Sequence, residues 1–177
     1  MLTAGSDTAQ VGDVFTIPIS IANVLGLTSF QFDLSFNPTV IKALSFTDIG
    51  TDFSTAASTG GGILTGITGF IDNMTGVLSG VADSISLATI GLTPSGVVVD
   101  ATFQALAVGN TPFTLSNAFL TDNGVSLSSA NGNSMLQNGQ ATVLETTVPE
   151  PSSLIILLSF TLAGWGILRC RRRGGGD

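Results

Sequence analysis

The side chains that carry out most catalytic chemistry are scarce in this sequence. Its 177 residues include no histidine, and Cys170 is the single cysteine. Serine triads of the usual kind and imidazole general bases are therefore excluded, and a zinc site would have only carboxylates as ligands. A glycosidase needs two carboxylates in a cleft, which short loops between strands seldom form. We therefore predict that the protein is not an enzyme, with no catalytic residues, no metal site and no cofactor.

Oxygen-bearing side chains gather in three places: Asp48 with Asp52, Asp72 with Asn73, and Asp122 with Asn123. In turns, such side chains usually accept hydrogen bonds from the local backbone. Together with backbone carbonyls they can instead bind a surface calcium ion, although no EF-hand spacing is present. We interpret the three clusters as turns, and a structural calcium ion is the alternative.

Exposed aromatic rings offer another kind of chemistry, because sugars stack on them. Most phenylalanines here occupy the inward positions of predicted strands, so only Phe53 and Phe70 are candidates for exposure. Core packing is the preferred interpretation for both. Trp165 lies in a C-terminal apolar segment and is excluded as a sugar platform. The ligand-binding residues are therefore unknown from the sequence.

Alternation of apolar and polar residues predicts the strands that must position any binding site. It extends from Phe15 to Ile21, and it places Phe30, Phe32, Leu34 and Phe36 on one face that needs a packed partner sheet. Further strands are predicted at residues 40–46, 67–71, 77–87, 97–107, 113–120 and 141–144. The glycine-rich residues 50–66 are predicted to form a loop or a weakly paired strand. Residues 1–145 are thus expected to form an all-β, antiparallel sandwich.

Charge is divided unevenly along the chain. Residues 1–153 contain eleven acidic side chains and one basic side chain, Lys42, whereas four arginines lie near the C-terminus. An acidic domain repels phosphate backbones, so no nucleic-acid partner is expected.

The composition changes near residue 146. Residues 146–153 form a stiff linker with two prolines. Residues 154–168 are apolar or small, and the adjoining serines extend the run to about 17 residues, the lower limit for a transmembrane helix. The basic residues that follow stop transfer and keep residues 169–177 in the cytoplasm: Arg169, Arg171, Arg172 and Arg173. An exported domain also needs a signal peptide, and the chain begins without one. We therefore expect a start codon upstream or a longer precursor.

The tail resembles a PEP-CTERM sorting signal. The resemblance rests on Val148-Pro149-Glu150-Pro151, one apolar segment, and the closing Arg169-Cys170-Arg171-Arg172-Arg173. It implies that Pro149, Glu150 and Pro151 are read by exosortase, a membrane-embedded processing enzyme of Gram-negative bacteria that make exopolysaccharide. Before cleavage the domain is held at the cell membrane. Cleavage then releases or re-anchors it, so that the domain is at the cell surface or outside the cell. An ordinary membrane anchor with a proline-containing stalk is the alternative.

Residues 4–145 resemble the cohesin-like modules. The similarity lies in Val11-Gly12-Asp13-Val14-Phe15, in Asn23-Val24-Leu25-Gly26-Leu27 and in the segment from Phe30 to Asn37-Pro38. It implies a nine-stranded jelly-roll sandwich, related to cellulose-binding modules, that binds dockerins through one sheet face. Asn37 departs from the usual Asp, and residues 50–66 have no clear counterpart. The predicted function is adhesion or scaffold binding to a surface protein, and carbohydrate binding to exopolysaccharide or another polysaccharide is the alternative.

Overall fold

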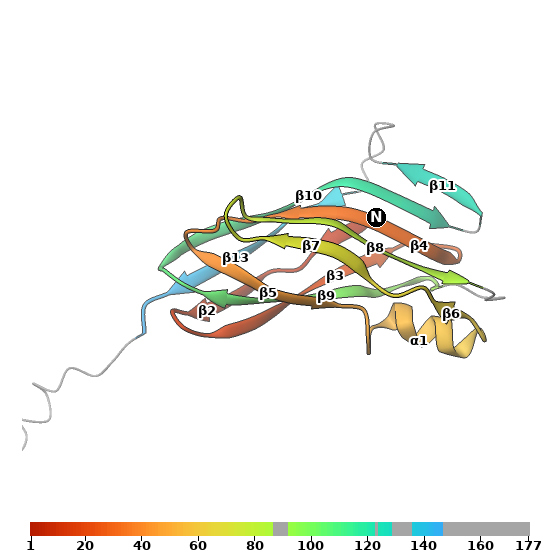
Figure 1. Ribbon diagram of the computed structural model, residues 1–177, viewed down its shortest axis with the longest axis horizontal. Coiled ribbons are helices and arrows are strands. Elements are labelled where there is room, and N and C mark those ends of the chain that lie inside the picture. Colours follow the sequence, from red (N-terminus) through yellow and green to blue (C-terminus); the bar gives the residue numbers. More distant parts are fainter. Residues whose placement is uncertain (87–91, 123, 129–135, 147–177) are drawn as a thin grey trace, which may run out of the picture. The chain divides into compact units, whose positions relative to one another are not determined.

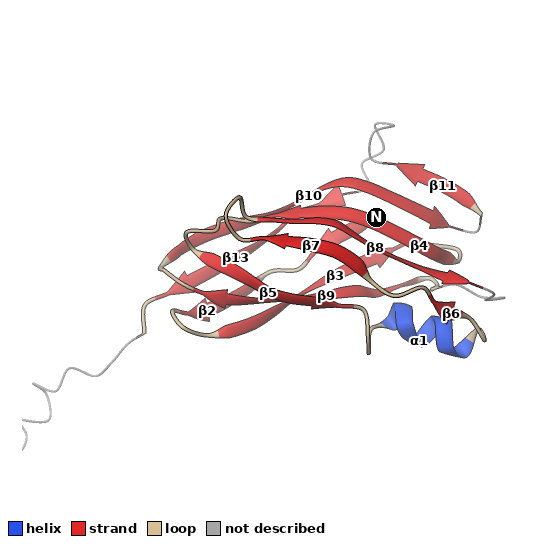
Figure 2. Ribbon diagram, viewed as in Figure 1, coloured by secondary structure: helices blue, strands red, loops and turns tan. Residues whose placement is uncertain are grey.

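Two β-sheets pack against each other in the computed structural model, and a short helix lies at one end of the sandwich (Figure 1). The structure describes residues 1–86, 92–122, 124–128 and 136–146. The chain divides into a compact unit, Met1–Glu145, and a second unit, Thr146–Asp177. All of the described strands belong to the first unit, which strands dominate (Figure 2).

The first sheet contains five strands in the order β12 (Leu136–Gln137), β1 (Leu2–Ala4), β3 (Val14–Ala22), β9 (Ser95–Ala105) and β5 (Ile41–Thr47). The alternating segment predicted from Phe15 to Ile21 lies in β3. Its antiparallel register with β9 runs from Val14 opposite Gln104 to Ala22 opposite Ser95. The strongest alternation in the sequence therefore forms the centre of this sheet.

The second sheet follows the order β2 (Asp7–Gln10), β13 (Gly139–Leu144), β10 (Gly109–Asp122), β4 (Leu27–Ser35), β8 (Val77–Ser86) and β6 (Ile63–Leu64). Two strands pair beside this path: β11 (Val125–Ser128) with β10, and β7 (Thr68–Asp72) with β8. The long strands β10, β4 and β8 lie next to one another and form the middle of the sheet.

The sandwich is all-β as predicted, but it is not wholly antiparallel. The pairs β1–β12 and β2–β13 are parallel. The N-terminal segment changes sheets at Gly5–Ser6, so that β1 and β2 each run beside a C-terminal strand in the same direction. Hydrophobic alternation indicates which face of a strand is buried and carries no information on the direction of its neighbour, which is why the sequence missed this feature.

Aromatic rings fill the interior between the sheets. The predicted inward side chains of the β4 segment are all buried: Phe30, Phe32, Leu34 and Phe36. Phe103 of the first sheet contacts Phe113 of the second, with 5.1 Å between the ring centroids. The core is therefore complete within residues 1–145.

Residues 50–66 differ from the prediction, because they contain the helix α1 (Asp52–Thr59). Thr51 caps it by accepting a hydrogen bond from the Ser54 amide at 3.4 Å. Phe53 and Ala57, one turn apart, are both buried, and the Phe53 ring meets Phe30 edge-on at 4.9 Å. The prediction was wrong for residues 52–59, because the glycine run ends a helix here and eight residues are too few for a clear helical period. The weakly paired strand that was expected is β6, which pairs with β8 over two residues.

The predicted tail elements lie outside the described residues. They are Pro149, Glu150 and Pro151, the apolar residues 154–168, and the basic residues Arg169, Arg171, Arg172 and Arg173. Within the described part of the chain, no helix is both long enough and apolar enough to cross a membrane.

Candidate partner-binding face

Four neighbouring strands of the second sheet turn one side away from the core. The register places Thr68 of β7, Ala82 of β8, Gln31 of β4 and Phe119 of β10 in one row across the sheet. We call this side the outer face. Its outward residues are Thr68, Phe70, Ser79, Ala82, Ser84, Ser29, Gln31, Asp33, Ser35, Thr114, Ser116, Phe119 and Thr121. Small hydroxyl-bearing side chains predominate, which leaves backbone and rings accessible.

Asp33 lies between two β-bulges of the outer face. Its Oδ1 accepts a hydrogen bond from the Gly80 amide at 2.7 Å, and its Oδ2 accepts one from Asn117 Nδ2 at 2.5 Å. Gly80 and Asn117 have φ values of 60° and 49°, and the register of β4 with each neighbour shifts beside them. Because a bulge bends and twists its strand, one carboxylate fixes the shape of the face on both sides of β4.

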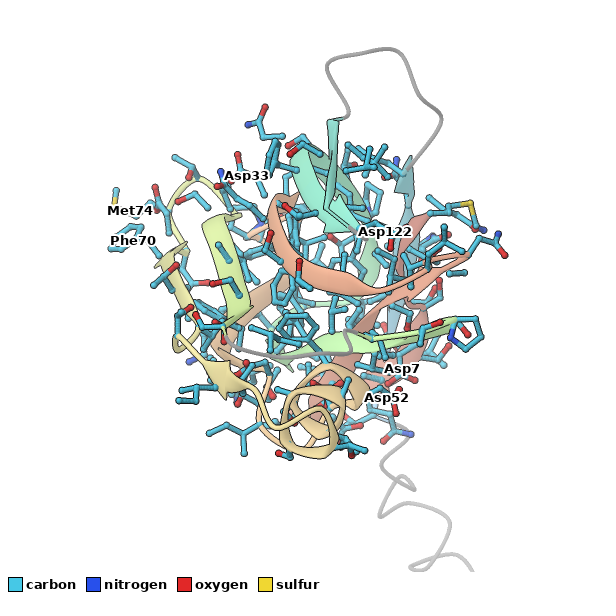
Figure 3. The ribbon with its side chains drawn as sticks, turned by 90° about the vertical axis from the view of Figure 1, so that its right-hand side faces the viewer. Asp7, Asp33, Asp52, Phe70, Met74 and Asp122 are labelled. Atoms are coloured by element: carbon cyan, nitrogen blue, oxygen red, sulfur yellow. The ribbon has the colours of Figure 1, made fainter. Side chains whose placement is uncertain are left out.

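Large apolar side chains are exposed on or beside the outer face. Phe70 is 66% exposed and Phe119 is 42% exposed, while Met74, in the turn after β7, is 92% exposed. Figure 3 shows Phe70 and Met74 pointing away from the body of the domain, on the same side as Asp33. Exposed apolar side chains on one side of a domain favour contact with a partner.

The two phenylalanines singled out in the sequence have opposite environments. Phe53 packs in the core as predicted, with its side chain fully buried. Core packing was wrong for Phe70, because it lies two residues after the outward Thr68 in β7 and so on the same side of the sheet; the register of β7 with β8 shifts between these two residues. Gly69 lies at that shift with a φ of 145°, a value that glycine adopts readily. The irregularity places Phe70 opposite the outward residue Ser79.

A cavity of about 290 Å³ lies on the outer face beside Phe119. Its lining includes the hydroxyl groups of Ser29, Thr68 and Ser84 and the amide of Gln31. These groups donate and accept hydrogen bonds, and the Phe119 ring supplies an apolar wall. The cavity therefore suits a polar group carried on an apolar stem, such as a side chain of another protein.

Two of the oxygen clusters from the sequence prove to be structural. Asp72 Oδ2 accepts a hydrogen bond from the Thr75 hydroxyl at 2.7 Å, and Asp72 Oδ1 accepts hydrogen bonds from the Met74 amide at 2.8 Å and the Thr75 amide at 3.2 Å. The Thr75 hydroxyl first, and then the two amides, lower the pKa of Asp72. Asn73 clamps Ala43 of β5 through both the amide and the carbonyl of that residue. Asp122 accepts hydrogen bonds from the amides of Leu25 and Gly26, and Asn123 lies outside the described residues.

The remaining pair separates in the structure. Asp52 Oδ2 accepts a hydrogen bond from the Val97 amide at 2.8 Å, which joins α1 to β9. Asp48 is buried and faces Asp83 of β8 instead. The turn interpretation therefore describes Asp72 well, whereas Asp48 requires another account.

Comparison with known proteins identifies the domain. The sequence pattern of the cohesin domain matches residues 1–143. The chain belongs to the cohesin family. Cohesin domains are non-catalytic binding modules. A search of curated proteins found no match.

Solved cohesins share the fold at low sequence identity. A non-cellulosomal cohesin from Archaeoglobus fulgidus has 16% identity and a TM-score of 0.61, with 86% of this chain and 94% of that chain covered. The cohesin of a type I cohesin–dockerin complex from Clostridium thermocellum has 14% identity and a TM-score of 0.60, covering 82% and 93%. A cohesin from Clostridium acetobutylicum has 16% identity and a TM-score of 0.57, covering 84% and 92%.

A second match covers residues 147–173, which carry a PEP-CTERM protein-sorting motif. This motif indicates an exported protein that is held at a membrane and processed. The cohesin domain and the sorting motif follow each other in the chain without overlap.

Sequence reasoning missed Phe119 as a surface residue. In β10, Phe113 and Leu115 point inward, and then Ala118 and Leu120 do. The interval of three between Leu115 and Ala118 signals a bulge at Asn117, and it moves Phe119 to the outward phase. Unbroken alternation from Phe113 would place Phe119 inward, so the one signal of the bulge in the sequence is the polar Asn117 at an inward position.

Proposed function

We propose that this cohesin domain is an exported, non-enzymatic adhesion or scaffold module that binds a protein partner on its outer face. The observation that carries the proposal is the exposure of Phe70 and Phe119 on a sheet face whose shape Asp33 fixes. Aromatic anchors in a surface of uncharged hydrogen-bonding groups are typical of protein interfaces. Several solved cohesins of this fold are complexes with dockerins, so a dockerin-like domain is the favoured partner.

The sorting motif gives the proposed location. Exosortase reads Pro149, Glu150 and Pro151, while residues 154–168 span the membrane and Arg169, Arg171, Arg172 and Arg173 stop transfer. Processing then places the cohesin at the cell surface or outside the cell. The PEP-CTERM match at residues 147–173 supports this assignment.

The proposal is tested with three forms of the full chain in mild detergent: wild type, Phe70→Ala with Phe119→Ala, and Leu44→Ala. Leu44 is 42% exposed on β5 of the other sheet, so it is a matched control for loss of exposed apolar area. Each form is immobilised and presented with purified dockerin domains and with envelope proteins of the producing bacterium. We expect the double variant to lose binding at least about 30-fold, the equivalent of about 2 kcal/mol, while Leu44→Ala binds like wild type.

Equal binding by the wild type and the double variant would refute the outer face as the binding site. A glycan array with the same three proteins tests polysaccharide binding, for which Phe70 offers a ring and the cavity beside Phe119 offers hydroxyl groups. If the domain bound a glycan and no protein, the proposal would be wrong and the domain would be a carbohydrate-binding module.

A further inference from the structure

Two buried aspartates from different sheets meet inside the domain. Asp48 directly follows β5 in the first sheet, and Asp83 occupies an inward position of β8 in the second. Their side chains are only 2% and 5% exposed. The pair therefore joins the two layers of the sandwich near the loop that leads into α1, where Thr51 donates to the Asp48 carbonyl through both its amide and its hydroxyl.

Each carboxylate has one oxygen without a hydrogen-bond donor. Asp83 Oδ1 accepts hydrogen bonds from Thr65 Oγ1 at 2.8 Å and from the Ser84 amide at 2.6 Å. Among the described residues, neither Asp83 Oδ2 nor Asp48 Oδ2 has a partner. Among the described residues, Lys42 is the single lysine or arginine. Neither carboxylate forms an ion pair within this part of the chain. Two carboxylate oxygens in the interior without donors are costly, and the cost is relieved either by a shared proton, which would hydrogen-bond Asp48 to Asp83, or by a cation between them.

The surrounding groups are those of a hard-cation site. Thr65 Oγ1 lies 2.8 Å from Asp83 Oδ1 and 3.0 Å from Ser84 Oγ, which brings hydroxyl oxygens to the Asp83 side of the pair. Thr65, Asp83 and Ser84 also line the 290 Å³ cavity of the outer face, so the Asp83 side of the pair lies next to a hollow that solvent fills. Calcium takes six to eight oxygen ligands and tolerates irregular geometry, and two carboxylates balance its charge.

We propose that Asp48 and Asp83 bind one calcium ion between the sheets, with Thr65 and Ser84 supplying neighbouring oxygens. The ion would fix the loop after β5 to β8. This places the ion beside the cavity of the outer face, so binding would also order one wall of that cavity. The inference concerns the domain itself and does not depend on the identity of the partner.

The test uses the full chain in mild detergent, stripped with a chelator and then titrated with CaCl2, with MgCl2 and NaCl at matched ionic strength as comparisons. Thermal unfolding is followed by circular dichroism, and binding by calorimetry. Asp48→Asn and Asp83→Asn keep the side-chain shape, and the new amide can donate to the remaining carboxylate, so we expect both variants to fold. Asp7→Asn, at an exposed position, is the control for lost surface charge.

We expect one calcium ion per chain and a rise in the wild-type Tm of about 5–10 °C at 100-fold excess over the Kd, with the same rise in Asp7→Asn. Asp48→Asn and Asp83→Asn should lose both the calorimetric signal and the shift. An equal shift in all four proteins would mean surface screening and would overturn the site. No shift in the wild type would also overturn it, leaving a shared proton as the neutralising charge.

Discussion

At the scale of single residues, the aspartates of this domain fall into two groups. Some accept hydrogen bonds from residues close by in the sequence, and others accept them from residues far along the chain. Asp72 binds amides two and three residues ahead, so its turn is readable from the sequence. Asp122 binds amides 96 and 97 residues away, and Asp33 reaches Gly80 and Asn117 across two strand pairs. Those roles depend on the register of strands, which no local pattern specifies. The sequence therefore identified the Asp72 turn and missed the other two clamps.

The Asp48–Asp83 pair also predicts how stability depends on pH in a metal-free buffer. Burial first, and then hydrogen bonding and charge repulsion with Asp83, raise the pKa of Asp48 from 3.8 to about 6. The folded state then binds more protons than the unfolded state between these values. This contribution to stability is fully present below about pH 4 and is lost as the pH rises through 6.

Chemical denaturation between pH 4 and pH 7.5 in the presence of a chelator measures this effect. The other carboxylates follow the opposite trend when native contacts lower their pKa, as for Asp72, so the comparison is made with Asp48→Asn. The unfolding free energy of the wild type, minus that of Asp48→Asn, should increase as the pH falls from 7 to 4. A constant difference would show that Asp48 titrates normally.

At the scale of elements, long alternating strands were predictable and short or interrupted ones were not. The sequence placed β3 and β4 well because apolar side chains recur at every second residue for a whole strand. It missed β1, β2 and β12, which have two to four residues each and whose pairing depends on the rest of the sheet. It also missed α1, where the burial of Phe53 and Ala57 against the core stabilises a helix of modest propensity.

One phenylalanine of β4 and one of β7 offer a paired test of inward and outward positions. Phe32 is 1% exposed between the sheets, so Phe32→Ala leaves a cavity and should destabilise the domain by about 3–5 kcal/mol. Phe70→Ala removes the same ring from an exposed edge position and should change stability by less than about 0.5 kcal/mol. Denaturant unfolding of the full chain in detergent measures both. Similar losses in the two variants would contradict the assigned faces.

At the scale of the whole molecule, the two parts of the chain have different roles. The described core residues of the cohesin domain all lie before Glu145, and the proposed binding face uses only residues of that unit. The sorting motif starts at residue 147 and bears on where the domain is delivered. The order of short motif, apolar segment and arginines is linear, so the sequence alone revealed it. The outer face assembles from strands distant in the chain and needed the structure.

Delivery is expected to depend on one side chain. Glu150 lies between two prolines, which disfavour helix and hold the backbone extended for a processing enzyme. Insertion instead depends on the apolar residues 154–168 and on the arginines behind them, to which Glu150 contributes little. In a host with an exosortase, Glu150→Ala should therefore stay full-length in the membrane, while wild type appears shortened and at the surface or in the medium.

Glu145→Ala is the matched control, because it removes a carboxylate five residues earlier, outside the Pro-Glu-Pro sequence. Immunoblots of membrane and medium fractions should show the Glu145→Ala protein processed like wild type. A host without exosortase should hold all three proteins at full length, since insertion does not require the enzyme. The contrary outcome is that Glu150→Ala and wild type give the same sizes and the same distribution in both hosts. The tail would then be a plain membrane anchor, and the cohesin domain would stay attached to the membrane.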